Sequence, residues 1–164
     1  MPESTHAKKL KLPLVSLLSK LFEPFFRLEL KFEVYPIMRH SVKPDLKAAV
    51  INAPENYVDA LRHNTALSPT LNGKFDWIQI FVKSKAELDA LAPKAAKALK
   101  PESMLWISFP KGTSKIQTDL TRDKGWDILR DLELKWINLI SVNEMWSAFS
   151  LRPYRAGEEK QTFR

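Results

Sequence analysis

Apolar residues divide the chain into two differently patterned parts. Up to about residue 41, Leu14 to Phe22 has helical spacing, and Arg27 to Tyr35 alternates with the period of two that is typical of a strand. Beyond it, short apolar runs alternate with stretches of helical spacing. The pattern predicts an N-terminal extension or insertion over 1–41, a folded domain over 42–152 and a polar, frayed tail over 153–164.

Three buried parallel strands are predicted in the folded domain, near residues 47–52, 76–82 and 104–109. The stretch Phe75 to Val82 is almost continuously apolar, as in a strand that is covered on both faces. Two further strands, near 135–142 and 145–151, flank Asn143-Glu144 and predict an antiparallel hairpin.

Helices are predicted between these strands. One begins at Ala53-Pro54-Glu55, because proline is tolerated in a first turn. Ser84 and Glu87 form a capping box for a second helix, with a kink or break expected at Pro93. A third is predicted from about Thr121 to Leu132. The alternation indicates an α/β fold: a three-layer, Rossmann-like, mostly parallel sheet that ends in an antiparallel hairpin.

Composition narrows the class of protein. The chain has 164 residues and no cysteine, which excludes disulfides and thiolate chemistry and fits a reducing compartment. No stretch of about 20 apolar residues is present, so we expect no transmembrane segment and a cytoplasmic location.

The net charge of +7 is concentrated near the N-terminus. Residues 1–43 hold eight Lys and Arg against four Glu, whereas residues 44–152 hold fifteen against thirteen acidic residues. This distribution favours a solvated basic surface over a nucleic-acid site. The segment 10–38 is a candidate surface for a protein partner; its few cations disfavour an interfacial membrane helix.

The strand Met104 to Phe109 runs directly into a loop rich in cations and hydroxyls. Ligands of open α/β sheets bind where strands end, so this loop is the first candidate for a site. A small anionic ligand is the predicted partner; a solvated loop without a ligand is the alternative. The candidate ligand-binding residues here are Asn52, at the end of the first strand, and Lys111, Thr113, Ser114 and Lys115.

Further along, Asp119, Arg122 and Asp123 are candidates to orient a substrate or to transfer protons. A cap or an ion pair is the structural alternative for these residues. Trp146 is the tryptophan predicted to meet a ligand, because a hairpin turn lies beside it. The three histidines lack metal-ligand spacing, so no metal site is predicted. The sequence motifs do not identify a cofactor.

From Phe75 onward the order of motifs resembles the C-terminal half of class I, S-adenosylmethionine-dependent methyltransferases. Phe75-Asp76-Trp77-Ile78 resembles the "FDxI" strand of that fold, and Ala98-Leu99-Lys100-Pro101 resembles its "LKPGG" turn. The glycine-rich cofactor turn of that family is replaced here by Asn52-Ala53-Pro54. The fold is therefore expected, and binding of S-adenosylmethionine is not.

Four separated motifs, over about two-thirds of the chain, resemble the bacterial family called domain of unknown function 3052. They are Val50 to Pro54, Leu105 to Gly112, Thr118 to Asp123 and Trp146-Ser147-Ala148. The resemblance implies a compact Rossmann-like domain and no established reaction. Residues equivalent to Leu10 and Lys43 are neighbours in that family, so 12–42 is either a genuine insertion or a gene-model artefact.

The leading hypothesis is a small Rossmann-like domain that binds an anionic ligand at the strand-end loop 110–115. The alternative is an enzyme: a diverged, methyltransferase-like group-transferase that uses Asp119, Arg122 and Asp123. The third hypothesis is a protein-interaction module that uses residues 10–38.

Overall fold

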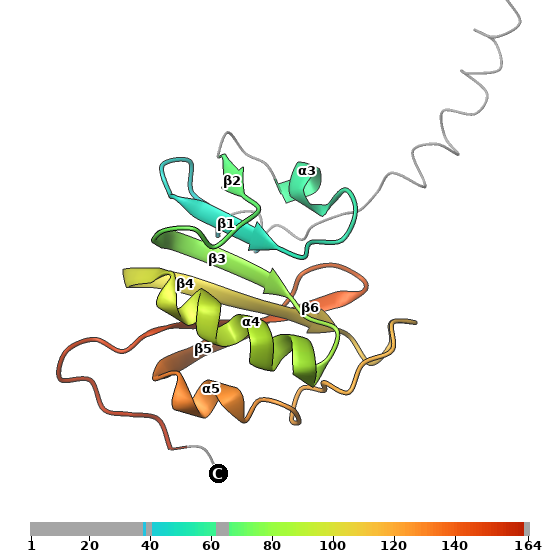
Figure 1. The fold of residues 1–164 in the computed structure, drawn as a ribbon. Coiled ribbons are helices and arrows are strands. Elements are labelled where there is room, and N and C mark those ends of the chain that lie inside the picture. The colour runs from blue at the N-terminus through green and yellow to red at the C-terminus, as the bar shows by residue number, and fades with distance from the viewer. Residues whose placement is uncertain (1–37, 39–40, 62–65, 163–164) are drawn as a thin grey trace, which may run out of the picture. The chain divides into compact units, whose positions relative to one another are not determined.

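The computed structural model describes Met38, residues 41–61 and residues 66–162. These residues contain a six-stranded sheet in the order β2-β1-β3-β4-β6-β5 (Figure 1). Neighbouring strands from β2 to β4 are parallel, and β6 is antiparallel to both β4 and β5. The strands are β1 (Ala48–Ile51), β2 (Leu67–Ser68), β3 (Phe75–Phe81), β4 (Leu99–Pro110), β5 (Leu134–Ser141) and β6 (Trp146–Pro153).

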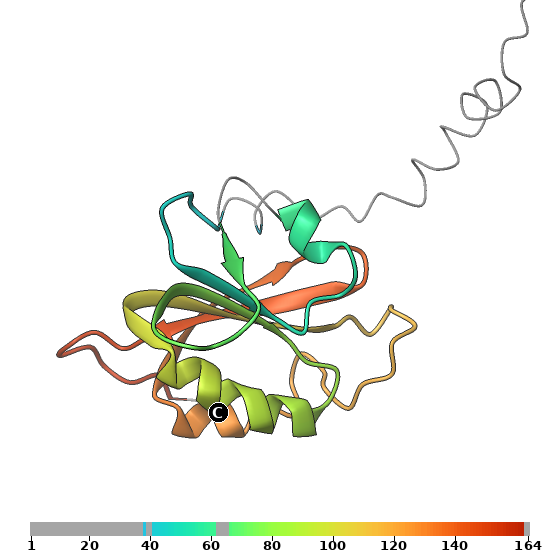
Figure 2. The ribbon, with the colours of Figure 1, turned by 45° about the horizontal axis from the view of Figure 1, so that its top comes forward.

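Helices cover both faces of the sheet, which makes three layers. Helix α3 (Tyr57–Leu61) lies on one face, whereas α4 (Lys85–Lys97) and α5 (Ile128–Asp131) lie on the other (Figure 2). The predicted α/β class, the mostly parallel sheet and the final antiparallel pair are confirmed. Among the described residues, no helix has the length and apolar character needed to cross a membrane.

Strand β3 is buried on both faces, as its apolar run predicts. Ile78 and Ile80 pack in the core cluster that includes Leu88 of α4. On the other face, the ring of Phe81 lies edge-on to that of Tyr57, with centroids 4.6 Å apart. A nearly continuous apolar sequence is therefore what the middle layer requires.

A buried polar chain ties α3 to β3 and β4. The Tyr57 hydroxyl donates to Oε1 of Gln79 at 2.7 Å, and Nε2 of Gln79 donates to Oγ of Ser108 at 2.8 Å. Burial raises the pKa of the Tyr57 phenol far above its ordinary value. Because Gln79 and Ser108 are both fully buried, these hydrogen bonds offset the cost of removing their polar groups from water.

The predicted capping box of α4 forms with one change: the Glu87 carboxylate bonds the N–H of Lys83, the residue before the cap, in place of the N–H of Ser84. Oγ of Ser84 accepts from the backbone N–H of Glu87 at 3.2 Å, and the Glu87 carboxylate accepts from the N–H of Lys83 at 2.7 Å. The helix continues through Pro93 to Lys97, so the expected break does not occur. The missing N–H of Pro93 removes one backbone bond, and burial of Leu88, Ala92 and Ala95 holds the helix on both sides of it.

The first predicted helix begins later than expected. Asn52 and Asn56 have φ angles of 54° and 62°, and helix α3 starts only at Tyr57. Left-handed residues on both sides of Ala53-Pro54 prevent the helix from starting there. Asparagine tolerates this conformation better than most residues, so the turn forms without glycine.

Strand β4 begins earlier than the predicted residue 104. Leu99 pairs with Phe75 and Met104 pairs with Trp77, so the register shifts between these two pairs. Glu102, with φ of 62°, lies within the extra residues. This irregularity lets β4 start directly after α4.

The predicted helix from Thr121 to Leu132 is largely wrong: only Ile128–Asp131 is helical. Thr121 instead forms a bridge with Lys124, and Gly125 has φ of 99°. The indole N–H of Trp126 donates to the carbonyl of Thr121 at 2.7 Å, which closes a turn where the helix was expected.

The C-terminal tail folds back on β5. The Glu158 carboxylate accepts from Arg152 at 2.7 Å and from the Arg155 N–H at 3.0 Å, and it pairs with Lys135. Arg152, then Arg155 and Lys135, hold the pKa of Glu158 far below its ordinary value. The side-chain amide of Gln161 pairs with both the N–H and the C=O of Trp136, at 2.8 and 3.0 Å. Residues 153–162 are thus attached at several points.

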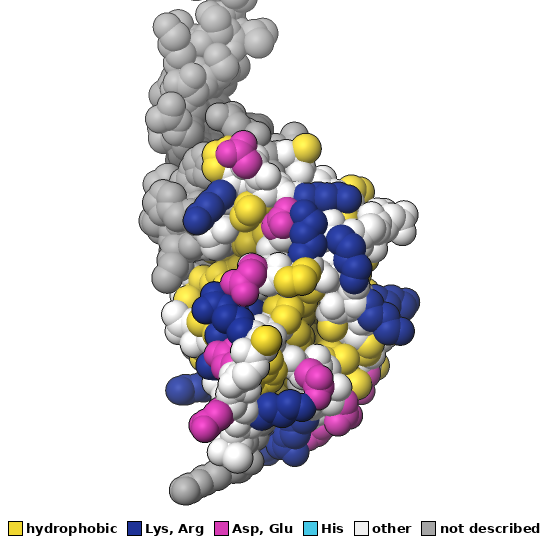
Figure 3. Space-filling model, turned by 90° about the vertical axis from the view of Figure 1, so that its left-hand side faces the viewer, with side chains coloured by type: hydrophobic (Ala, Val, Ile, Leu, Met, Phe, Trp, Pro, Cys, Tyr) yellow, Lys and Arg dark blue, Asp and Glu magenta, His cyan; other side chains and the backbone are white. Residues whose placement is uncertain are grey.

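Charges of both signs are interspersed on the face shown in Figure 3. A half-buried ion pair joins Lys100 to Asp76 at 2.9 Å, and an exposed one joins Arg155 to Glu102 at 2.9 Å. Such pairs contribute only about 0–1 kcal/mol each. The predicted extension over 1–41 and the predicted partner surface over 10–38 lie outside the described residues except at Met38 and Ser41, so both stay predictions.

Candidate ligand-binding site

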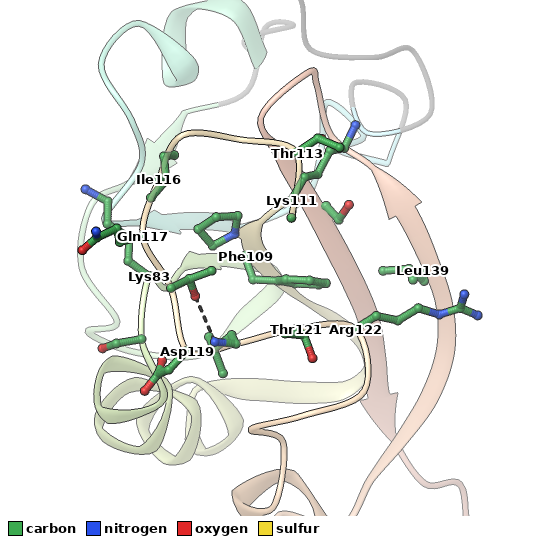
Figure 4. Close-up of a pocket in the computed structure, with 16 residues that line it drawn as sticks. Lys83, Phe109, Lys111, Thr113, Ile116, Gln117, Asp119, Thr121, Arg122 and Leu139 are labelled. Atoms are coloured by element: carbon green, nitrogen blue, oxygen red, sulfur yellow. Dashed lines mark hydrogen bonds between the residues drawn. The ribbon is translucent and has the colours of Figure 1, made fainter.

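A cavity of about 1020 Å³ opens at the carboxyl ends of β3 and β4 (Figure 4). Lys83 and Ser84 follow β3, and the loop after β4 supplies most of the wall. Leu139 of β5 and Ser147 of β6 close the opposite side. The cavity therefore lies at the sheet edge where open α/β folds hold their ligands, and its volume is at the upper end of small-molecule sites, roughly 300–1000 Å³.

The floor of the cavity is apolar. Phe109, at the end of β4, lies at its centre in Figure 4. Phe109 is held in place by other rings: it stacks on Phe149 with centroids 5.3 Å apart and meets Trp126 edge-on at 4.9 Å. The other apolar lining residues are Pro110, Ile116, Leu120 and Leu139. This surface favours an apolar body in the ligand.

The rim carries a surplus of positive charge. Three cations line it, Lys83, Lys111 and Arg122, against the single carboxylate of Asp119. That carboxylate accepts from the backbone N–H of Lys85, in the first turn of α4, at 2.7 Å. Asp119 thus already caps the first turn of α4. The three cations and one carboxylate together favour an anionic ligand at the rim.

The loop that forms the wall is fixed by its own hydrogen bonds. The N–H of Lys111 donates to the carbonyl of Met145 at 2.8 Å, which ties the loop to the hairpin. The N–H of Leu120 donates to Oγ1 of Thr118 at 3.0 Å, the bond drawn in Figure 4. Asp119 attaches the same segment to α4. Two hydrogen bonds thus attach the loop to the hairpin and to α4, and a third closes a turn within the loop.

Four of the nine predicted site residues line this cavity: Lys111, Thr113, Asp119 and Arg122. Ser114 and Lys115 belong to the same loop but do not line it, so the two lysines do not share one cleft. Asp123 lines a neighbouring cavity. Asn52 is exposed in the turn after β1 and does not line the cavity either.

Trp146 lies in the core. Its side chain is 2% exposed and its ring meets that of Phe81 edge-on at 5.1 Å, on the face of the sheet that α3 covers. The neighbouring Ser147 points to the other face, as successive strand residues do, and lines the cavity instead. The tryptophan predicted to contact a ligand is thus buried in the core, and its neighbour Ser147 lines the cavity.

Sequence reasoning missed several lining residues that come from separate elements. Lys83 lies two residues after the end of β3, and that position after the neighbouring parallel strand was a signal that could have identified it. Leu139 and Ser147 could be found only from the order of β4, β6 and β5 in the sheet.

The turn after β1 does not present open backbone. Its left-handed positions, Asn52 and Asn56, both carry side chains, and Ala53-Pro54 lies between them. A cofactor that needs close approach to this backbone would meet these side chains. The turn therefore does not fit the glycine-rich approach that S-adenosylmethionine uses in the methyltransferases this sequence resembles.

This domain has the strand order and the helices on both faces that define a Rossmann-like fold. It is similar to an O-methyltransferase family 2 protein from Planctomyces limnophilus, with a TM-score of 0.53 and 11% identity over 88% of this chain and 66% of that one. It is also similar to magnesium protoporphyrin IX methyltransferase from Synechocystis, with a TM-score of 0.51 and 10% identity over 85% of this chain and 100% of that one.

A third similar structure is the mitomycin 7-O-methyltransferase MmcR, with a TM-score of 0.52 and 10% identity over 74% of this chain. The match covers 51% of that enzyme, so this chain spans about half its length. At such identities the likeness shows the fold alone. No protein-family model matches the sequence, and no curated protein matches it.

Proposed function

We propose that this domain binds a small ligand with an apolar body and an anionic group in the cavity at the carboxyl ends of β3 and β4. The observation that carries the proposal is the combination of an apolar floor around Phe109 with a rim of three cations and one carboxylate. The body packs on the floor, and the anionic group receives hydrogen bonds from the rim.

A single carboxylate among the described residues lines the cavity. This carboxylate, Asp119, is engaged by the Lys85 N–H, and Asp123 lies in the neighbouring cavity. Among the described residues, no group of three or more His, Asp or Glu is placed to hold a metal ion. Binding is thus the function that these residues support best.

Lys111→Met is expected to weaken binding of naphthyl phosphate, an aromatic probe with one anionic group. A hydrogen bond to a charged group contributes about 1.5–3 kcal/mol, so its loss should raise Kd roughly tenfold to a hundredfold. Isothermal titration calorimetry of the full chain measures the change.

Lys115→Met is the matched control, because it removes the same charge from the same loop but outside the cavity. Its Kd should stay within about twofold of the unaltered protein, since Lys115 is exposed outside the cavity and salt screens its charge. Equal losses in the two variants would mean that only overall charge attracts the probe, and no detectable binding to the unaltered protein would reject the site.

Methyl transfer is the second candidate, favoured by the fold shared with the methyltransferases above. We expect no micromolar binding of S-adenosylmethionine, because side chains occupy the turn at Asn52 and Asn56. Calorimetry with this cofactor and the full chain decides between the candidates. Micromolar affinity would overturn the expectation and make methyl transfer the leading function.

A further inference from the structure

A second cavity of about 550 Å³ adjoins the first along the same loop. Its apolar lining is aromatic: Trp126, Trp136 and Phe149. These rings meet edge-on, with Phe149 centred 4.9 Å from Trp126 and 4.6 Å from Trp136. This cavity has no role in the site described above.

The floors of the two cavities are continuous. Phe109 lines the first cavity and Phe149 lines the second, and their rings stack at 5.3 Å with an angle of 17° between the planes. They come from the neighbouring strands β4 and β6, on the face that α4 and α5 cover. One apolar surface therefore runs beneath both openings.

Arg122 is the residue that lines both cavities. In Figure 4 it extends from the loop beside Leu139 of β5. Within the described part of the chain, its guanidinium has no ion pair or hydrogen bond, although Asp119 and Asp123 are close in sequence. The cation at the junction is thus available to a ligand, and its planar fork suits a phosphate or a carboxylate.

Positive charge exceeds negative charge in the second cavity as well. Arg122, Lys124 and Arg130 line it together with Asp123 and Asp127, three cations against two carboxylates. An anion is therefore favoured over a cation on either side of the junction, and Arg122 is the cation that both sides share.

We propose that the two cavities form a single groove for an elongated ligand with an anionic centre and an apolar arm on each side, the chemistry of an aryl or alkyl phosphodiester. Arg122 holds the anionic centre. One arm lies over Phe109 in the first cavity, and the other lies over the Trp126, Trp136 and Phe149 rings in the second. This inference rests on the proposed function and extends the same site.

Two probes separate the extension from the function on which it rests. Naphthyl phosphate has one arm and a charge between about −1.5 and −2 at neutral pH, whereas bis-naphthyl phosphate has two arms and a single negative charge. Attraction by charge alone favours the one-armed probe. The groove favours the two-armed probe, and we expect its Kd to be lower by at least about tenfold, because a second aromatic group is buried.

The position of the second arm is read from the indole N–H signals of the five tryptophans in a ¹⁵N spectrum of the full chain. Trp126→Phe and Trp136→Phe assign the two signals from the second cavity. Only bis-naphthyl phosphate should move both. Arg122→Met should weaken that probe at least about tenfold, and Lys115→Met, outside both cavities, should leave it unchanged.

The outcomes are distinct. Tighter binding of the two-armed probe, with both indole signals shifted and with dependence on Arg122, supports the groove. If naphthyl phosphate binds but the second arm adds no affinity or moves neither signal, the groove is rejected and the ligand site of the first cavity remains. If neither probe binds, both proposals fail together.

Discussion

Replacing Trp146 with alanine should lower the free energy of unfolding by about 3–5 kcal/mol, the usual range for removing a large buried aromatic side chain. The side chain is 2% exposed and lies against Phe81 on the face that α3 covers. Its removal leaves a cavity beside the ring of Phe81. Urea denaturation, followed by circular dichroism, measures the loss.

The milder variant Trp146→Phe tests the role of this residue in binding. It keeps an aromatic ring in the core, so most molecules should stay folded, and the Kd for naphthyl phosphate should stay the same because the cavity lies on the opposite face. If the Trp146→Phe protein folds but no longer binds the probe, the indole contacts the ligand, and Trp146 does not lie on the face opposite the cavity.

Gly125→Ala is expected to destabilise the protein by about 1–3 kcal/mol, the cost of a residue forced into a sparsely populated backbone region. Gly125 has φ of 99°, and an added Cβ would lie 2.5 Å from Cδ2 of Leu120. Leu120 is 1% exposed and forms part of the cavity floor, so its displacement should also weaken binding of naphthyl phosphate. Urea denaturation and calorimetry report the two effects.

Gly112→Ala is the control for this substitution, because it lies in the same loop. A Cβ at Gly112 meets no atom within 4 Å, and its φ is not in the left-handed region. We expect its stability to change by no more than about 0.5 kcal/mol. If the two variants were equally stable, the turn around Gly125 would not depend on its backbone conformation.

The sheet could be predicted from the sequence because its strands are short apolar runs. Phe75 to Phe81 must be buried on both faces, and no amphipathic helix has such a continuous pattern. The capping box at Ser84 was equally local, since its hydrogen bonds join residues four or fewer positions apart. Such features need no knowledge of the rest of the fold.

The last helix was overestimated because helical spacing does not guarantee a helix. Trp126 and Leu129 are buried at a spacing of three, yet only Ile128–Asp131 is helical. The Trp126 side chain satisfies a carbonyl at Thr121, and Gly125 supplies a left-handed residue just before it. The hydrophobic pattern shows neither a side-chain hydrogen bond that spans five residues nor a positive φ angle.

The sequence placed most of the candidate site residues after a single strand, β4. Lys111 and Thr113 follow β4 directly, so the rule that ligands bind at strand ends identified them. Lys83, Leu139 and Ser147 join them only through the order of the strands. Lys115 shows the limit of the rule, because residues of one loop point in different directions.

The C-terminal tail also determines how the sheet can meet other molecules. β5 is an edge strand, and an unpaired edge is a template on which a strand of another chain can add. The amide of Gln161 occupies both backbone groups of Trp136 there and so acts as a short substitute for a seventh strand. Loss of residues 153–162 would therefore uncover an aggregation-prone edge, even though those residues contribute nothing to the ligand cavity.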